Sequence, residues 1–324
     1  RRQFSRLGGM YFLGTMVIFA VQYAASFAVG ILCPQWLWNG DFVLLLSMLP
    51  MYLIGMPVLI ILVRTIPAER VERRRIKAGS FLAAVVMAFG AVYLTNIIGN
   101  VITTLISMLR GLGVQNQLVN VTESASLWMI ALWMVVCAPI MEEYVFRKLI
   151  VDRTVRYGQG TAVLLSGLMF GLFHGNLNQF VYAFVLGLLL AFLYVKTGNL
   201  KITIALHMTV NFMGGVVSTA VSRMIDLEEY MALAQDMDIS AMMAYVNENM
   251  AGILAYGALA LFMFANVIAG LVLFIVCLAK RRFTFAKGQV AIPKGKRFRT
   301  VILNLGMLLY CLFWIANIVY QLFM

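Results

Sequence analysis

The amino-acid sequence predicts an all-α polytopic transmembrane protein with about eight or nine spanning helices. Hydrophobic residues make up 63% of the chain and charged residues only 12%, whereas soluble domains are about 45–50% apolar and about 25% charged. Long runs of Leu, Val, Met and Ala, with only 6 prolines, favour helices over a β-barrel, whose strands would alternate polar and apolar residues.

Nine apolar runs follow one another along the chain. In order, they cover about 9–33, 42–63, 81–109, 126–158, 161–174, 179–195, 200–222, 251–279 and 300–323. The first run is too long for the hydrophobic region of a cleavable signal peptide, so we expect it to be a retained span. The fifth run is too short to cross about 30 Å of hydrocarbon. We therefore expect an irregular turn inside the membrane, formed by Asn176, Asn178 and Gln179, where the backbone is buried in protein or lines a wet cavity.

The distribution of charge predicts how these spans are oriented. If the N-terminus lies inside, every basic residue except Arg110 and Arg223 falls on the inner side, as the positive-inside rule requires. The acidic segment 223–248 then lies outside. Membrane topology therefore explains the net charge of +12, and we expect no nucleic-acid partner.

We expect residues 1–324 to form a single membrane domain in three parts. About three N-terminal spans occupy 1–125, a four-helix core occupies 126–222, and an external acidic segment with the C-terminal helices occupies 223–324. The 4 cysteines are widely spaced in apolar runs without a CxxC pair, so neither a disulfide framework nor a cysteine metal site is indicated.

Two adjacent carboxylates, Glu142 and Glu143, lie near the inner end of the fourth run. Ionisable groups inside a membrane are costly, so they indicate a functional site with a partner nearby. The chain has 2 histidines, His174 and His207, and both lie in later apolar runs. Glu142 and His174 are equally far along the chain from an expected turn at Gly158, so they should face each other at one depth. His207 is about 12 Å into its own helix at 1.5 Å per residue, which is a similar depth.

Helical spacing assigns neighbours to these residues. Glu143 and Arg147 are four residues apart, with the carboxylate first, which is the favoured order for an ion pair. Glu142 then points about 100° away from that pair and remains free for chemistry. His207 and Asn211 share one helical face, as Phe170 and His174 do; we expect Phe170 to contribute packing.

These side chains are sufficient for hydrolysis of an amide bond. A glutamate beside a histidine can act as a general base on water, and a histidine with an asparagine can donate hydrogen bonds to a developing oxyanion. A zinc site made by Glu142, His174 and His207 is an alternative. Each residue alone also has a structural interpretation, as a buried ion pair or an interhelical hydrogen bond, but the placement of all of them at one depth favours a site.

Three short motifs carry a resemblance to a known family. The segment E-E-Y-V-F-R at 142–147 resembles the EExxxR motif of the CPBP family of CAAX-prenyl and bacteriocin-processing membrane proteases, also called Abi proteins. F-G-L-F-H at 170–174 and H-M-T-V-N at 207–211 resemble its FxxxH and HxxxN motifs. The resemblance covers about 125–220, and the three motifs are also similar to those of the family in their order and approximate spacing.

The resemblance implies an intramembrane endopeptidase with a catalytic four-helix core. Glu142 would activate water with the assistance of His174, His207 and Asn211 would form the oxyanion hole, and Glu143, Arg147 and Phe170 would support the site. It also implies a metal-free glutamate mechanism, with Zn²⁺ as the alternative.

The expected function is therefore cleavage of a membrane-associated peptide or protein near the cytoplasmic face. The alternative is a non-catalytic scaffold or bacteriocin-immunity protein that binds a partner membrane protein; a transporter is a weaker alternative, since no inverted repeat is visible. We expect a multi-pass protein of a bacterial plasma membrane with a cytoplasmic N-terminus. The sequence does not indicate the oligomeric state.

Overall fold

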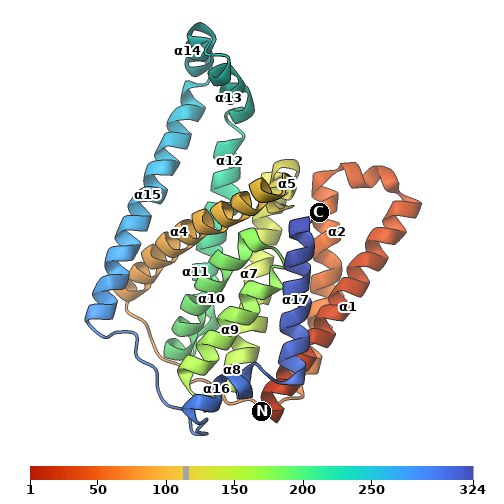
Figure 1. Ribbon diagram of the computed structural model, residues 1–324, viewed down its shortest axis with the longest axis vertical. Helices are drawn as coiled ribbons and strands as arrows, with labels where there is room; N and C mark the ends of the chain where they lie inside the picture. The colour runs from red at the N-terminus through yellow and green to blue at the C-terminus, as the bar shows by residue number, and fades with distance from the viewer. Residues whose placement is uncertain (112–116, 324) are drawn as a thin grey trace.

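The described residues, 1–111 and 117–323, form a bundle of helices without any strand, as the computed structural model in Figure 1 shows. Eight of these helices are long and apolar enough to cross a membrane, and a ninth apolar helix, α9 (Gln159–Phe173), has 15 residues. The predicted all-α fold with about eight or nine spans is confirmed. The expected short fifth helix is α9.

Three spans precede the core. The first is α1 (Arg2–Leu32); the second joins α2 (Gly40–Pro50), a π-helical turn η2 (Met51–Gly55) and α3 (Met56–Arg64); the third is α4 (Ala78–Arg110), followed by the short α5 (Gln117–Ser124). A short 3₁₀ turn η1 (Pro34–Trp38) joins the first two spans.

The fourth span is one continuous helix that changes its hydrogen-bond register twice. Its parts are α6 (Leu127–Ile130), the π-helical η3 (Ala131–Cys137), α7 (Ala138–Glu142), the π-helical η4 (Glu143–Leu149), α8 (Ile150–Thr154) and the 3₁₀ turn η5 (Val155–Tyr157). Gly158 follows with a φ of 112°, a conformation that favours glycine, and the chain reverses into α9 there. The predicted turn at Gly158 is confirmed.

The turn after α9 differs in detail from the prediction. The irregular backbone covers His174 to Asn176, and Gly175 has a φ of 68°. Asn178 and Gln179 lie in the first turn of α10 (Leu177–Thr197), because the Asn176 side chain caps this helix by accepting the Gln179 backbone N–H at 2.8 Å. The expected irregular turn is therefore confined to the residues before α10.

The remaining helices complete the core and extend beyond it. The seventh span joins α11 (Leu200–Asn211), the π-helical η6 (Phe212–Val217) and α12 (Ser218–Ser222). Two short helices, α13 (Leu227–Gln235) and α14 (Ile239–Glu248), then precede the span α15 (Met250–Ala279). The last span, α17 (Leu305–Phe323), follows the 3₁₀ turn η7 (Lys294–Lys296) and α16 (Arg297–Val301). The acidic segment consists of α13 and α14.

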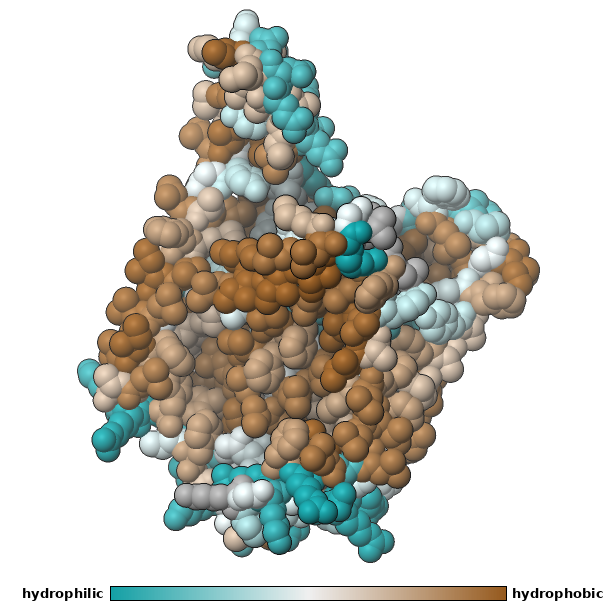
Figure 2. Space-filling view, in the orientation of Figure 1, coloured by the Kyte–Doolittle hydropathy of each residue, from teal (hydrophilic) through white to brown (hydrophobic). Residues whose placement is uncertain are grey.

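Charge is separated between the two ends of the molecule. Figure 2 shows hydrophilic residues at both ends and a hydrophobic belt between them. The N-terminus, the segment after α3 and the segment after α15 lie at one end, and α13 and α14 project at the other (Figure 1). The basic segments and the acidic segment thus lie at opposite ends, as the charge pattern predicts. Which end faces the cytoplasm stays a prediction.

The outer helices α1, α3 and α17 pack directly on the core. Phe4 and Tyr11 from α1, Tyr310 from α17, and Phe146 and Phe170 from the core belong to one buried cluster. A second cluster joins α4 to α10 and α11. The side chains of the core helices are therefore positioned by neighbours at both ends of the sequence.

Candidate active site

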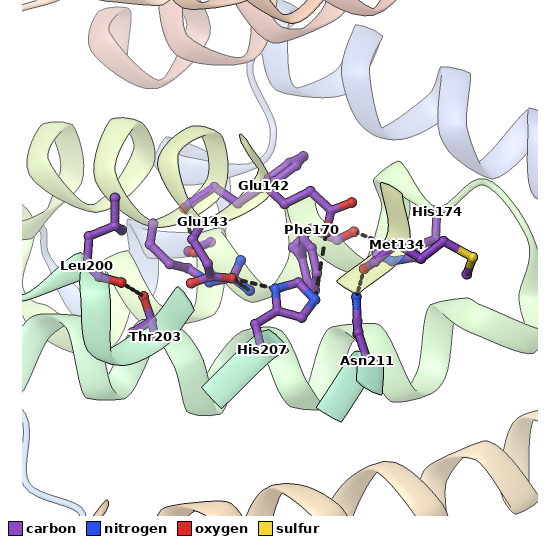
Figure 3. Close-up of polar contacts among 12 residues, drawn as sticks. Met134, Glu142, Glu143, Phe170, His174, Leu200, Thr203, His207 and Asn211 are labelled. Carbon is purple, nitrogen blue, oxygen red and sulfur yellow. Dashed lines mark hydrogen bonds and ion pairs between the residues drawn. The ribbon is translucent and has the colours of Figure 1, made fainter. Parts of the chain in front are cut away.

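Three core segments bring the predicted site residues together, as Figure 3 shows. Glu142 and Glu143 lie where α7 passes into η4, which also carries Arg147. Phe170 and His174 lie at the end of α9, and His207 and Asn211 lie on α11. The following contacts define how these side chains are arranged.

The predicted pair of Glu143 and Arg147 is present and fully buried. Arg147 Nη2 and Glu143 Oε1 are 3.0 Å apart, and both side chains are 0% exposed. Glu143 Oε1 also accepts a hydrogen bond from His207 Nδ1 at 3.0 Å. Glu143 thus joins the fourth and seventh spans, a link that the spacing alone did not indicate because it does not fix the rotation of one helix relative to another.

Phe170 contacts Arg147 and both histidines. The Arg147 guanidinium carbon lies 4.2 Å from the centre of the Phe170 ring, a cation–π distance. The Phe170 ring meets the imidazoles of His174 and His207 edge to face, with centroids 4.8 and 5.7 Å away. The packing expected of Phe170 therefore orients both histidines.

Glu142 has a different environment from its neighbour. Its side chain is 14% exposed, and its Oε2 lies 3.8 Å from His207 Nε2. This separation is too long for a direct hydrogen bond, and it is a distance that one water molecule can bridge. Glu142 is therefore available to a water molecule, whereas Glu143 is held by Arg147 and His207.

The tautomers of the two histidines follow from their partners. His174 Nδ1 is 2.9 Å from the Phe170 carbonyl oxygen, and His207 Nδ1 is 3.0 Å from a carboxylate oxygen. Because carbonyl and carboxylate oxygens only accept hydrogen bonds, each Nδ1 carries a proton. The Nε2 atoms of both rings are then left for chemistry.

Glu142 and His174 do not meet as directly as the hairpin predicts. In 1–111 and 117–323, no hydrogen bond or ion pair joins these two side chains; Glu142 has its ion-pair contact with His207 instead. The reason is local, because the chain leaves the helix at His174 and the ring binds the carbonyl one turn earlier. Both residues still lie in the same site, because His174 contacts Phe170 and Glu142 lies beside His207.

Asn211 fixes the register change of the fourth span. Its side-chain amide donates to the Met134 carbonyl at 2.8 Å. In η3 the Ala138 N–H bonds the Trp133 carbonyl five residues earlier, so the next carbonyl, that of Met134, would need the N–H of residue 139. Pro139 has none, and Asn211 supplies the donor. The amide keeps a second N–H for another acceptor.

The zinc alternative stays a prediction, and the donor set bears on it as follows. Among the residues that the structure describes, no three His, Cys, Asp or Glu side chains converge as a group that could hold a metal ion. The Nδ1 atoms of His207 and His174 are bound to Glu143 and to the Phe170 carbonyl, which leaves both Nε2 atoms for other partners. We derive no step through a metal.

Two buried hydroxyls that the sequence reasoning missed also bind the segment that carries the glutamates. Tyr11 in α1 donates to the Val145 carbonyl at 2.5 Å, and Ser166 in α9 donates to the Phe146 carbonyl at 2.7 Å. Both carbonyls belong to η4, between the glutamates and Arg147. A buried polar residue in each apolar run was the available signal, but the sequence does not show which carbonyl it reaches.

Comparison with known proteins points to one family. The family model described as type II CAAX prenyl endopeptidase Rce1-like matches residues 124–213. A Bacillus subtilis (strain 168) protein named "Putative membrane peptidase YdiL" is 27% identical over 160 residues, which cover 48% of this chain and 64% of that protein. The match thus spans less than two thirds of the relative. No solved structure gives a significant match.

These matches confirm the resemblance to the CPBP family that the three motifs indicate. The matched residues 124–213 contain all of the predicted site residues. They begin just before α6 and end in η6, so the match covers the helices that carry the site.

Proposed function

From the CPBP-family identity of the 124–213 core, we propose that this membrane protein is an intramembrane endopeptidase that hydrolyses a peptide bond with water activated by Glu142. One observation carries the proposal. Glu142 is partly exposed and lies 3.8 Å from His207, whose other ring nitrogen binds the buried Glu143. This arrangement supplies a base with a partly exposed side chain and an imidazole oriented beside it.

In the proposed mechanism, the Glu142 carboxylate takes a proton from the attacking water as the oxygen bonds to the scissile carbonyl carbon. His174, with its proton on Nδ1, offers Nε2 as an acceptor that orients the same water. The proton held by Glu142 then passes to the leaving amine as the C–N bond breaks. Water and peptide bond are thereby converted to a carboxylic acid and an amine, and transfer of the acid proton to the amine gives the carboxylate and the ammonium.

His207 and Asn211 are proposed to stabilise the tetrahedral oxyanion. Asn211 has one amide N–H beyond the one that binds Met134. His207 already donates from Nδ1 to Glu143, so it can donate from Nε2 only as an imidazolium. The carboxylate of Glu143, 3.0 Å from His207 Nδ1, provides the negative charge that such an imidazolium needs. Donors aimed at a developing oxyanion in a dry site contribute several kcal/mol of transition-state stabilisation, roughly 2.7–4 for one donor.

We further propose that the mechanism needs no metal, because His207 as a zinc ligand would lose the contacts that make it an oxyanion donor. Activity should survive EDTA and phenanthroline. One zinc per chain, with activity lost on chelation and restored by Zn²⁺, would reverse this assignment.

The proposed substrate is a membrane-associated peptide or protein, cut near the cytoplasmic face of a bacterial plasma membrane. The basic residues gathered at the end of the molecule that holds the N-terminus support this orientation. Peptide maturation, signal processing or bacteriocin immunity fits such a site.

Terminal proteomics tests the function in cells. Membrane fractions from cells that carry the wild type or the Glu142→Ala variant are compared for new peptide termini, with expression of both chains matched. We expect termini that depend on Glu142 and map to membrane-proximal segments. An identical set of termini, with a wild-type phenotype retained by the variant, would favour the scaffold alternative.

A further inference from the structure

A cavity that none of the candidate active-site residues lines lies at the basic end of the molecule. Its volume is about 550 Å³, and its walls come from the segment after α3, the turn between α8 and α9, the end of α10 and the segment after α15. We call it the strap pocket, because two loop segments cross the core helices there. The first strap is the segment after α3 (65–77), and the second strap is the segment after α15 (280–293). Its charged lining residues are Glu69, Arg70, Glu72, Arg74, Arg156, Lys196 and Lys287.

The strap pocket has an excess of positive charge that the protein does not neutralise. Five basic and two acidic side chains line it, a net charge of +3. Both acids are already engaged, Glu72 with Arg74 at 2.7 Å and Glu69 with Arg156 at 3.6 Å. In the described part of the chain, Arg70 and Lys287 have no ion-pair partner, and Arg156 Nε is buried without a hydrogen-bond partner. Several cations that line one pocket, with one buried donor unmet, are the chemistry that binds phosphate.

The pocket is built by specific backbone contacts rather than by loosely placed loops. Gln159 N–H donates to the Ala286 carbonyl and Val290 N–H donates to the Arg156 carbonyl, at 3.1 and 3.0 Å. On the opposite wall, Glu69 N–H donates to the Asp152 carbonyl at 2.6 Å. The two straps are therefore fixed against the fourth span, which carries the glutamates, and against the start of α9.

The surroundings of the pocket indicate a membrane interface. Phe192 of α10 contacts Phe283 and Phe285 of the second strap, with ring centroids 5.4 and 5.7 Å apart, and Phe285 also lines the pocket. These apolar rings lie beside the basic lining of the pocket, and basic pockets between spanning helices bind anionic headgroups.

We propose that the strap pocket binds the phosphate of an anionic phospholipid headgroup, which joins the two straps to the turn between α8 and α9. Arg70 comes from the first strap, Arg156 from the turn and Lys287 from the second strap. One phosphate among them offsets their mutual repulsion. The bound lipid thus stabilises the basic end of the core.

The test is a thermal-shift measurement on the purified full-length chain in a neutral detergent. Short-chain phosphatidylglycerol is titrated against short-chain phosphatidylcholine and inorganic phosphate. The variant Arg70→Gln/Lys287→Gln removes two unpaired pocket cations. Its matched control, Arg75→Gln/Arg282→Gln, removes two cations from the same straps that do not line the pocket.

We expect phosphatidylglycerol to raise the melting temperature of the wild type and the control by about 3 °C or more near saturation, with most of the shift lost in the pocket variant. An equal shift in all three proteins would overturn the proposal, because it would show unspecific attraction. The same residue-dependent shift from inorganic phosphate alone would assign the pocket to a soluble phosphate compound instead of a lipid. A shift with a hexaglutamate peptide and none with the lipid would assign it to an acidic peptide.

Discussion

Glu142 and Glu143 are neighbours in sequence, yet their environments give them different roles. Glu143 is fully buried between Arg147 and His207, whereas Glu142 keeps an exposed edge. The sequence predicts this division from the spacing of Glu143 and Arg147 alone. It does not predict that His207 binds Glu143, because that contact depends on how α11 is rotated against the fourth span.

The buried pair of Glu143 and Arg147 should contribute to stability. Removing one partner leaves a buried charge uncompensated, which costs roughly 3–5 kcal/mol. Glu143→Ala and Arg147→Ala should each lower the midpoint of thermal unfolding, and the double variant should be less destabilised than the two costs summed. A double-mutant cycle measures this coupling; strict additivity would show that the two side chains do not interact.

The Tyr11 hydroxyl should matter although no motif contains it. Tyr11→Phe leaves the buried Val145 carbonyl without its donor, at a cost of about 1–3 kcal/mol. We expect a lower melting temperature and a slower cleavage step, because η4 is displaced. Substrate affinity should change little, because the substitution does not block the binding of the substrate. Tyr23→Phe on the same helix is the control, since Tyr23 is 70% exposed. Equal effects of the two substitutions would show that the hydrogen bond of the Tyr11 hydroxyl does not support η4.

At the level of elements, the sequence predicts the existence of the helices better than their hydrogen-bond register. Apolar runs and the glycine at 158 indicate the spans and the hairpin. The π-helical segments η3 and η4 are not visible in the apolar pattern, because a π-helical turn changes which carbonyl is bonded and not which residues are apolar. Pro139 was the one local signal, since it removes a backbone donor.

The partnership of Asn211 with Pro139 gives a prediction about η3. Asn211→Ala should destabilise the wild type by about 1–3 kcal/mol, because the Met134 carbonyl loses its donor. In a Pro139→Ala background residue 139 regains an N–H, so the same substitution should cost less. Thermal unfolding of the four proteins measures the difference. Asn100→Ala, which removes an exposed hydrogen bond to Asn96, is the control, and its loss of stability should be the same in both backgrounds. If the loss of stability caused by Asn211→Ala is also the same with Pro139 and with Ala at position 139, the explanation is contradicted.

At the scale of the whole molecule, the charge pattern predicts the topology, and the structure adds the role of the outer helices. The alternation of nine segments places the basic and acidic segments at opposite ends. The packing of α1 and α17 on the core could not be predicted, since uniformly apolar spans give no indication of which helices are neighbours. Tyr310 of α17 illustrates this, because its hydroxyl donates to the Met169 carbonyl of α9 at 2.7 Å.

Labelling with an impermeant thiol reagent tests the orientation. In a background without the four native cysteines, a cysteine at Glu228 in α13 should react in intact cells, whereas cysteines at Arg75 or Arg282 should react only after the membrane is opened. The reason is the excess of Lys and Arg on cytoplasmic segments. Reaction of the Arg75 or Arg282 position in intact cells would invert the molecule and place the site near the opposite face.

The cleavage rate of purified protein in liposomes tests the central claim most directly. A substrate identified by terminal proteomics is incubated with the wild type and with Glu142→Gln, which keeps the size of the side chain and removes its basicity. Circular dichroism and melting temperature establish that both are folded. The account predicts cleavage by the wild type and, since general base catalysis contributes about 10²–10⁴-fold, a rate at least about 100-fold lower for the variant. Cleavage by Glu142→Gln at the wild-type rate would contradict it.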